Sequence, residues 1–284
     1  VLKCIGIDER YQGLGVSARI VTHLIRGAHR RGRDHLFLFT KPSNVEQFSG
    51  LGFRLIANTK KAALLESGTR RIEDFLPPEK PSVPAAAIVV NCNPFTLGHR
   101  HLIEQASLNH PLLFVFVLEE EASLFPFSTR LELVRRGVAD LPNVRVLPSG
   151  PYVISQATFP SYFLRDAEKA AAHVGLDATI FASRIAPAFG IVKRYVGEEP
   201  FCETTRQYNE ALSRILAAHG ISFEVLPRKE AGGKPISAST VRRCLRDGDF
   251  SSLASLVPAT TLDFLKSDEA LPIIQRIQTA DSPH

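Results

Sequence analysis

AAAIVVNCNPFTLGHRH, residues 85–101, is the stretch on which the fold of this chain depends. Its six apolar residues at 85–90 predict a buried strand, a proline-containing turn follows, and a helix is expected to begin near Leu97. A strand that passes through a turn into a helix directs backbone N–H groups and the positive helix end toward the carboxyl edge of a sheet. Ligands bind at that edge in α/β proteins, so the stretch predicts an anion site.

Two residues of this turn suggest which anion it binds. Gly98 would let a phosphate approach the backbone closely, and His99 could donate a hydrogen bond to it. The alternative is a purely structural corner with a buried histidine, and a Gly-His pair by itself favours that alternative.

Outward from this stretch, strand and helix patterns alternate along the chain. Apolar strands that alternate with amphipathic helices are typical of βαβ units and of a parallel sheet covered on both faces, so we expect an α/β fold. The expected strands are 1–7, 35–39, 53–57, 85–90, 112–118, 144–147, 191–196 and 221–226, and the expected helices are 16–30, 97–106, 130–140, 205–219 and 239–246.

Length and composition point to a globular protein with two domains. The chain has 284 residues, of which 44% are hydrophobic and 22% charged, and a domain averages roughly 150 residues. Residues 77–84, PPEKPSVP, contain four prolines and predict an extended linker between residues 1–76 and 85–284. The sequence begins at Val1 and contains no methionine, so we expect residues to be missing, an N-terminal stretch among them.

Several classes of protein are disfavoured by the sequence. No apolar run approaches the roughly 18 residues of a membrane span. The four cysteines, Cys4, Cys92, Cys202 and Cys244, form no CxxC pair, so we expect free thiols and a cytoplasmic protein without a cysteine metal site. The net charge of +5 is spread out. Its densest cluster, residues 30–33, follows a predicted helix and is expected to cap it, so we expect no nucleic-acid partner.

A second turn lies about 140 residues after the first, in KPISASTVR at 234–242. Ser237 and Ser239 precede a predicted helix, and capping that helix is their default role. Arg242 lies one turn into the helix, from where a guanidinium can reach phosphate oxygens gathered at the same end.

Together these two segments resemble the nucleotidyltransferase superfamily of the HxGH type, in which both hold the triphosphate of ATP. Thr96 stands where many members have the first histidine, as it does in the phosphopantetheine adenylyltransferase branch. Residues 85–266 more specifically resemble the citrate lyase ligase family. The segments that carry this resemblance are VVNCNPFTLGHRHLIEQA, ASLFPFSTRLELVRRGVADLPNVRVLPSG, YVISQATFPSYFL, RYVGEEPFCETTRQYN, PISASTVR and LVPATTLDFL.

The N-terminal part supports the same resemblance. Residues 10–15, RYQGLG, are similar to the turn of GCN5-related N-acetyltransferases whose backbone amides bind the pyrophosphate of coenzyme A. Residues 1–76 are thus expected to be a partial domain of that kind, with Arg10, Gly13 and Gly15 binding a coenzyme-A-like arm. A simple glycine turn is the alternative.

The resemblance implies an ATP-dependent ligase that activates acetate as acetyl-AMP and releases diphosphate. It then acetylates the coenzyme-A-derived thiol of the citrate lyase acyl carrier subunit and so switches citrate lyase on. The implied partners are ATP with Mg²⁺, acetate and that carrier. A plain adenylyltransferase with a phosphopantetheine-like acceptor is the first alternative, and an idle carrier-binding module is the second.

The resemblance also implies roles for single residues. His99 would contact the α-phosphate, Thr96 would bind phosphate, and Ser237, Ser239 and Arg242 would hold the β- and γ-phosphates with Mg²⁺ between them. The remaining expectations are Asn93 and Phe95 shaping the turn against the nucleotide, Gly197 in an adenine-contacting loop, and Arg130 either near the cleft or solvated at the surface.

Overall fold

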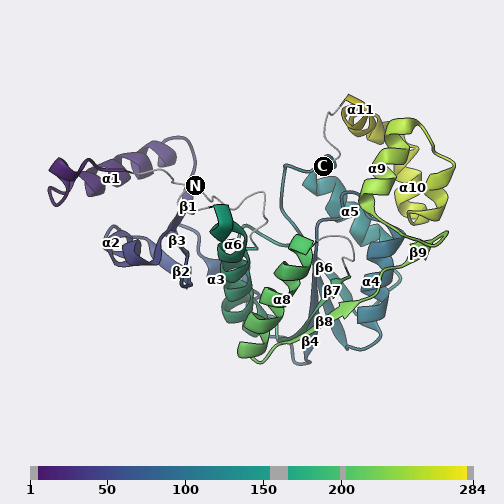
Figure 1. Cartoon of the computed structure of the whole chain (residues 1–284), viewed down its shortest axis with the longest axis horizontal. Coiled ribbons are helices and arrows are strands. Elements are labelled where there is room, and N and C mark those ends of the chain that lie inside the picture. The colour runs from purple at the N-terminus through teal and green to yellow at the C-terminus, as the bar shows by residue number, and fades with distance from the viewer. Residues whose placement is uncertain (1–5, 154–165, 199–202, 280–284) are drawn as a thin grey trace.

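The computed structural model describes residues 6–153, 166–198 and 203–279 (Figure 1). Its centre is a five-stranded parallel sheet in the order β6-β5-β4-β7-β8, which confirms the α/β expectation. From β4 the chain builds outward through β5 to β6, then returns to the other side of β4 for β7 and β8. The strands are β4 (Ala85–Val90), β5 (Leu112–Val117), β6 (Val144–Pro148), β7 (Ile191–Gly197) and β8 (Ser222–Leu226).

Helices cover both faces of this sheet. Successive residues of β4 point to opposite faces, so Ala86 and Ile88 join one apolar cluster while Ala85 and Ala87 join another. This explains why residues 85–90 are continuously apolar rather than alternating. One face is covered by α4 (Leu97–Ser107) and α5 (Phe127–Gly137), and the other by α6 (Asp166–Ile180), the π-helical turn η3 (Phe181–Ile185), α7 (Ala186–Ala188) and α8 (Glu203–Ala218).

The N-terminal part has a sheet of its own, and it is antiparallel with the order β1-β3-β2. The parallel pairing expected from alternating strands and helices was wrong for this part of the chain. Only a short turn separates β2 from β3, and neighbours joined in this way pair antiparallel. The strand at 63–68 was not expected. Of the strand expected at 1–7, residues 1–5 lie outside the described residues, and residues 6–7 are not in a strand. The elements are η1 (Glu9–Tyr11), α1 (Val16–His29), β1 (His35–Thr40), η2 (Pro42–Asn44), α2 (Val45–Ser49), β2 (Arg54–Asn58), β3 (Ala63–Gly68) and α3 (Ile72–Phe75).

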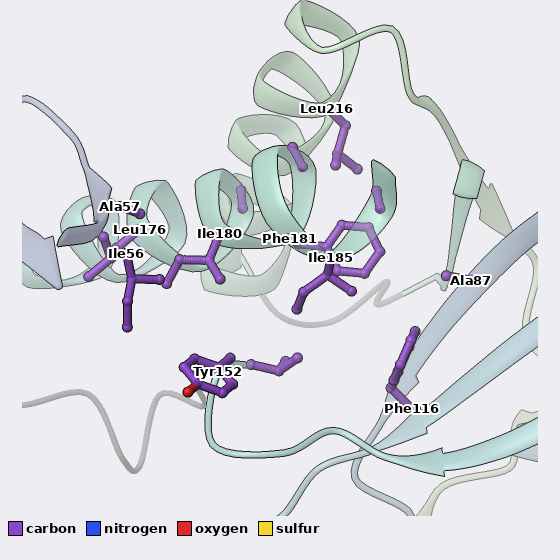
Figure 2. Packing of buried hydrophobic residues seen from close by; sticks show 14 of the residues in the cluster. Ile56, Ala57, Ala87, Phe116, Tyr152, Leu176, Ile180, Phe181, Ile185 and Leu216 are labelled. Carbon is purple, nitrogen blue, oxygen red and sulfur yellow. The ribbon is translucent and has the colours of Figure 1, made fainter. Parts of the chain in front are cut away.

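One apolar cluster joins residues on both sides of the proline-rich segment 77–84. Figure 2 shows Ile56 of β2 beside Leu176 and Ile180 of α6, with Phe116 of β5 in the same cluster. The N-terminal sheet is therefore packed against the larger sheet's helical layer.

The C-terminal residues form a small helical cap with its own apolar cluster, which includes Phe125, Ile236 and Leu245. Within the described ranges, no helix combines the length and the apolar character that crossing a membrane requires. The elements of the cap and of the hairpin before it are β9 (Glu230–Ala231), β10 (Lys234–Pro235), α9 (Ala238–Asp247), η4 (Ser252–Ser255), α10 (Ala259–Leu265), η5 (Asp268–Ala270) and α11 (Leu271–Thr279).

Candidate active site

A cavity of about 690 Å³ opens at the carboxyl ends of β4, β7 and β8. The strand order reverses between β4 and β7, and open α/β sheets bind their ligands at such a switch point. The cavity brings together most of the site residues expected from the sequence. Those that line it are Asn93, Thr96, Gly98, His99, Gly197, Ser237, Ser239 and Arg242.

Thr96 and His99 cap the first turn of α4 reciprocally. The Thr96 hydroxyl accepts from the backbone N–H of His99 at 3.3 Å, and Nδ1 of His99 accepts from the backbone N–H of Thr96 at 3.1 Å. Because Nδ1 is an acceptor, the ring proton of a neutral His99 sits on Nε2. Nε2–H is therefore the group that this histidine offers to a ligand.

The electrostatic surroundings keep His99 neutral. Burial and the positive charge of Arg228 lower its pKa to about 4. A neutral ring that donates from Nε2 suits a hydrogen bond to a phosphate oxygen near pH 7.

The start of α9 lines the same cavity as the first turn of α4. Ser237 caps α9, its hydroxyl accepting from the backbone N–H of Thr240 at 3.1 Å. Arg242 is buried, donates to the carbonyl oxygen of Asn93 at 2.6 Å, and lies 3.4 Å from the Ser239 hydroxyl. Two motifs that lie far apart in the sequence are thus joined by a direct hydrogen bond, and a guanidinium is held in the cavity wall.

The two glycines of the site play different parts. A Cβ on Gly98 would lie 3.1 Å from the carbonyl oxygen of Ile236, so the absent side chain lets the α4 start pack against the segment before α9. Gly98 also lines the cavity, and the close approach of a phosphate to it stays a prediction. Gly197 lines the cavity without any such constraint, since a Cβ there would meet only Leu102 at 3.8 Å.

Phe95 and Arg130 lie behind the cavity wall rather than in it. Phe95 is fully buried, stacks at 6.0 Å on the His99 ring, and packs where a Cβ of Gly137 would be. Arg130 has no exposed surface, so solvation at the surface is wrong for it. Its guanidinium donates to the carbonyl oxygens of Asn91, Leu118, Glu120 and Phe125 and to the Asn91 side chain, and so ties the loops that follow β4 and β5 together.

Arg228 is the most informative residue that the sequence analysis missed. It follows β8 at the same carboxyl edge, lines the cavity, and acts electrostatically on His99. Applying the strand-end rule to ISFEVLPR would have found it. Other cavity residues that the motifs did not indicate are Asn91, Glu120, Ser123, Tyr208 and Asn209.

The described residues that line the cavity suit a metal ion that binds through the phosphates of a ligand rather than one held by protein side chains alone. Across the described parts of the chain, no three His, Cys, Asp or Glu side chains gather where they could hold a metal. Glu120 is the carboxylate among the described cavity-lining residues, and Ser237 and Ser239 add hydroxyls. Mg²⁺ keeps several waters and binds through substrate phosphates in such sites. Cys92, in the cavity wall, is a buried free thiol whose pKa is raised by burial.

A second cavity, of about 410 Å³, lies at the start of α1. Gly13 and Gly15 line it, both with positive φ (80° and 70°), and Gly15 is the N-cap of α1. The expected turn before a helix is therefore present. Arg10 does not line this cavity; it is exposed and forms an ion pair with Asp8 instead.

Comparisons with a family model and with curated proteins point to the same family. The model of the citrate lyase ligase C-terminal domain matches residues 85–265. The citrate pro-3S-lyase ligase of Klebsiella pneumoniae is 42% identical over 275 residues, covering 93% of this chain and 80% of that protein. The protein of the same name from Haemophilus influenzae is 39% identical, covering 94% of this chain and 83% of that protein.

Solved structures give only remote likenesses. Thermotoga maritima TmcAL bound with alpha-thio ATP is 15% identical with a TM-score of 0.42, covering 66% of this chain and 56% of that one. Pantothenate synthetase from Thermus thermophilus is 15% identical with a TM-score of 0.41, covering 57% and 63%. Neither likeness bears on the site.

Proposed function

The chain belongs to the citrate lyase ligase family, and from that premise we propose that it uses ATP to join acetate to the thiol of the citrate lyase acyl carrier subunit. The observation that carries the proposal is the contact between the two motifs. The Arg242–Asn93 hydrogen bond joins the turn before α4 to α9 at one cavity, with His99 and Arg228 in its wall.

In the first step, a carboxylate oxygen of acetate attacks the α-phosphorus of ATP. The bond from that phosphorus to the bridging oxygen breaks, and diphosphate leaves with the bond's electron pair. His99 donates from Nε2 to the α-phosphate, while Ser237, Ser239 and Arg242 hold the β- and γ-phosphates. Such a transfer depends on positioning and on neutralising charge, which are the contributions these side chains can make.

In the second step, the carrier thiol attacks the carbonyl carbon of acetyl-AMP. The carbon–sulfur bond forms, the thiol proton passes to solvent, and AMP leaves with the electron pair of the broken carbon–oxygen bond. The intermediate is needed because forming a thioester directly from acetate is uphill in water.

The turn at Gly13 and Gly15 is our proposed docking point for the phosphates of the carrier's arm. Figure 1 shows α1 at one end of the molecule's longest axis and α9 toward the other. A docking contact so placed would set the Michaelis constant for the carrier rather than the rate of acetyl transfer. Replacing Gly13 with valine is expected to raise the Michaelis constant for the carrier. An unchanged Michaelis constant would contradict the proposed docking role of this turn.

Acetate-dependent exchange of labelled diphosphate into ATP, measured with Mg²⁺ and without carrier, tests the first step. Exchange that requires acetate supports reversible acetyl-AMP formation. If exchange is absent, the assay is repeated with deacetylated carrier, and absence there as well overturns the proposal. A stable dinucleotide product in place of free AMP would instead identify a plain adenylyltransferase.

A further inference from the structure

A separate cavity of about 360 Å³ lies at the α9 start, beside the proposed ATP site. Ser237, Ser239 and Arg242 line both cavities, so they form a shared wall. The other lining residues are Thr240, Arg243 and Arg246. We call this cavity the arginine groove.

The groove is cationic because α9 carries its arginines on one face. Residues 239, 242, 243 and 246 follow the three- and four-residue spacing that places side chains on one helix face. Val241 and Leu245, on the opposite face, are buried in the C-terminal cap. No carboxylate is among the described residues that line the groove, where three arginines lie beside the hydroxyl groups of Ser237, Ser239 and Thr240.

Among the described residues, Arg243 and Arg246 are not engaged in ion pairs. In the described ranges Arg243 is exposed and forms neither a hydrogen bond nor an ion pair, and Arg246 only donates from Nε to the carbonyl oxygen of Ile277 at 3.3 Å. Arg246 lies close enough to Arg242 for its charge to lower the Arg242 pKa, although burial is the larger cause. Neighbouring guanidinium groups repel one another, so the cluster is stabilised when an anion binds between them.

We propose that the arginine groove binds inorganic diphosphate as it leaves the active site. The inference rests on the proposed function, which makes diphosphate the first product. Arg242 and the two serines hold the terminal phosphates of ATP, and Arg243 and Arg246 continue the same cationic surface outward. Once the bond to the α-phosphorus breaks, diphosphate is free to shift along the shared wall, while bound ATP stays tethered by its α-phosphate and nucleoside.

Calorimetric titration of the free enzyme tests this without any catalytic step. Inorganic diphosphate and a non-hydrolysable ATP analogue, each with Mg²⁺, are titrated into the wild type and into Arg243→Gln/Arg246→Gln. We expect the diphosphate affinity of the double variant to fall by roughly tenfold, as loss of charge-assisted contacts predicts, and the analogue affinity to fall by a clearly smaller factor.

Arg135→Gln is the matched control, because Arg135 is an exposed arginine on α5 away from both cavities. It should leave both affinities unchanged. An unchanged diphosphate affinity in the double variant overturns the proposal, as does an equal fall for diphosphate and analogue, which would make these arginines part of the ATP site alone. If the enzyme shows no acetate-dependent exchange, the proposed function is contradicted, but the titration still reports whether the groove binds diphosphate.

Discussion

At the scale of single residues, the contacts of His99 bear on its structural role in a helix cap and on its proposed chemical role. Its Nδ1 completes the cap of α4 by accepting from the Thr96 backbone, while burial and Arg228 hold its pKa near 4. The same arrangement that begins the helix also fixes which ring nitrogen carries the proton. The side chain is thereby prepared as a neutral donor before any ligand binds.

Replacing His99 with alanine should therefore lower turnover by roughly a hundredfold or more, as removal of one transition-state donor does elsewhere. The fold should survive, since only one cap acceptor is lost. Steady-state kinetics and circular dichroism check this, with His101→Ala on the same helix as the control. A folded His99→Ala enzyme that keeps more than roughly a tenth of wild-type turnover would contradict the role.

The lowered pKa of His99 also predicts how stability depends on pH. The unfolded chain binds a proton at this position near pH 6.5, whereas the folded protein resists it until about pH 4. His99 thus costs stability progressively as pH falls from about 6.5 to 4 and costs none well above that window. Urea unfolding at about pH 7.5 and about pH 5 should show that His99→Ala loses less stability than the wild type. Equal losses would mean that the folded pKa is not lowered.

At the scale of elements, the cavity is formed by the ends of strands and the starts of helices rather than by their central residues. The ends of β4, β7 and β8 supply one side, and the starts of α4 and α9 supply the other. Arg242 and Gly98 hold the two helix starts together, one by a hydrogen bond and one by leaving room. Each element contributes a few residues, so the site exists only when the sheet is assembled.

Arg228, just after β8, offers a test of this arrangement. Arg228→Gln should raise the pKa of His99, because a nearby positive charge that disfavours protonation is removed. It should also weaken phosphate binding and slow diphosphate–ATP exchange by roughly tenfold. Arg228→Lys keeps the charge and should leave the His99 pKa low. NMR titration of the His99 ring measures this directly, and an unmoved pKa in Arg228→Gln would show that the two groups are not coupled.

At the scale of the whole molecule, a buried polar cluster joins the N-terminal sheet to the rest. Glu66 of β3 is 2% exposed and accepts from the Tyr152 hydroxyl at 2.7 Å, from the Ile72 backbone N–H at 3.1 Å, and lies 2.9 Å from the His35 ring. Burial, followed by the hydrogen bond to Glu66, raises the Tyr152 pKa, so this phenol stays a donor. Apolar packing alone would not fix the register between the two parts as this cluster does.

Tyr152→Phe should lower the free energy of unfolding by about 1–3 kcal/mol, because it leaves a buried carboxylate oxygen short of a donor while keeping the ring. Tyr11→Phe, at an exposed position, should change it by less than about 0.5 kcal/mol. Chemical denaturation of both variants compares them. If Tyr152→Phe matches the wild type, the cluster does not contribute to holding the two parts together.

Much of the fold could be predicted from sequence because its signals are local. The five parallel strands, α1, α4, α5, α8 and α9 all lie within a few residues of their expected positions. The strand at 63–68 was missed, since ALLESG contains a buried glutamate, Glu66, whose partners come from elsewhere in the chain. The surface alternative for Arg130 was wrong for a similar reason, since its backbone partners come from the loops after β4 and β5. The roles expected of Phe95 and Arg130 toward the nucleotide stay predictions.

By itself, the sequence determined which segments become strands and helices, where the two turn–helix motifs lie, and which family they indicate. These properties follow from periodicity, capping and turn chemistry within a few residues of each position. Only the tertiary structure decided that Arg242 reaches Asn93, that Arg228 acts on His99, and that Arg243 and Arg246 line a groove beside the candidate active site. Such contacts join residues brought together by the order of strands in a sheet, and that order results from packing the whole chain at once.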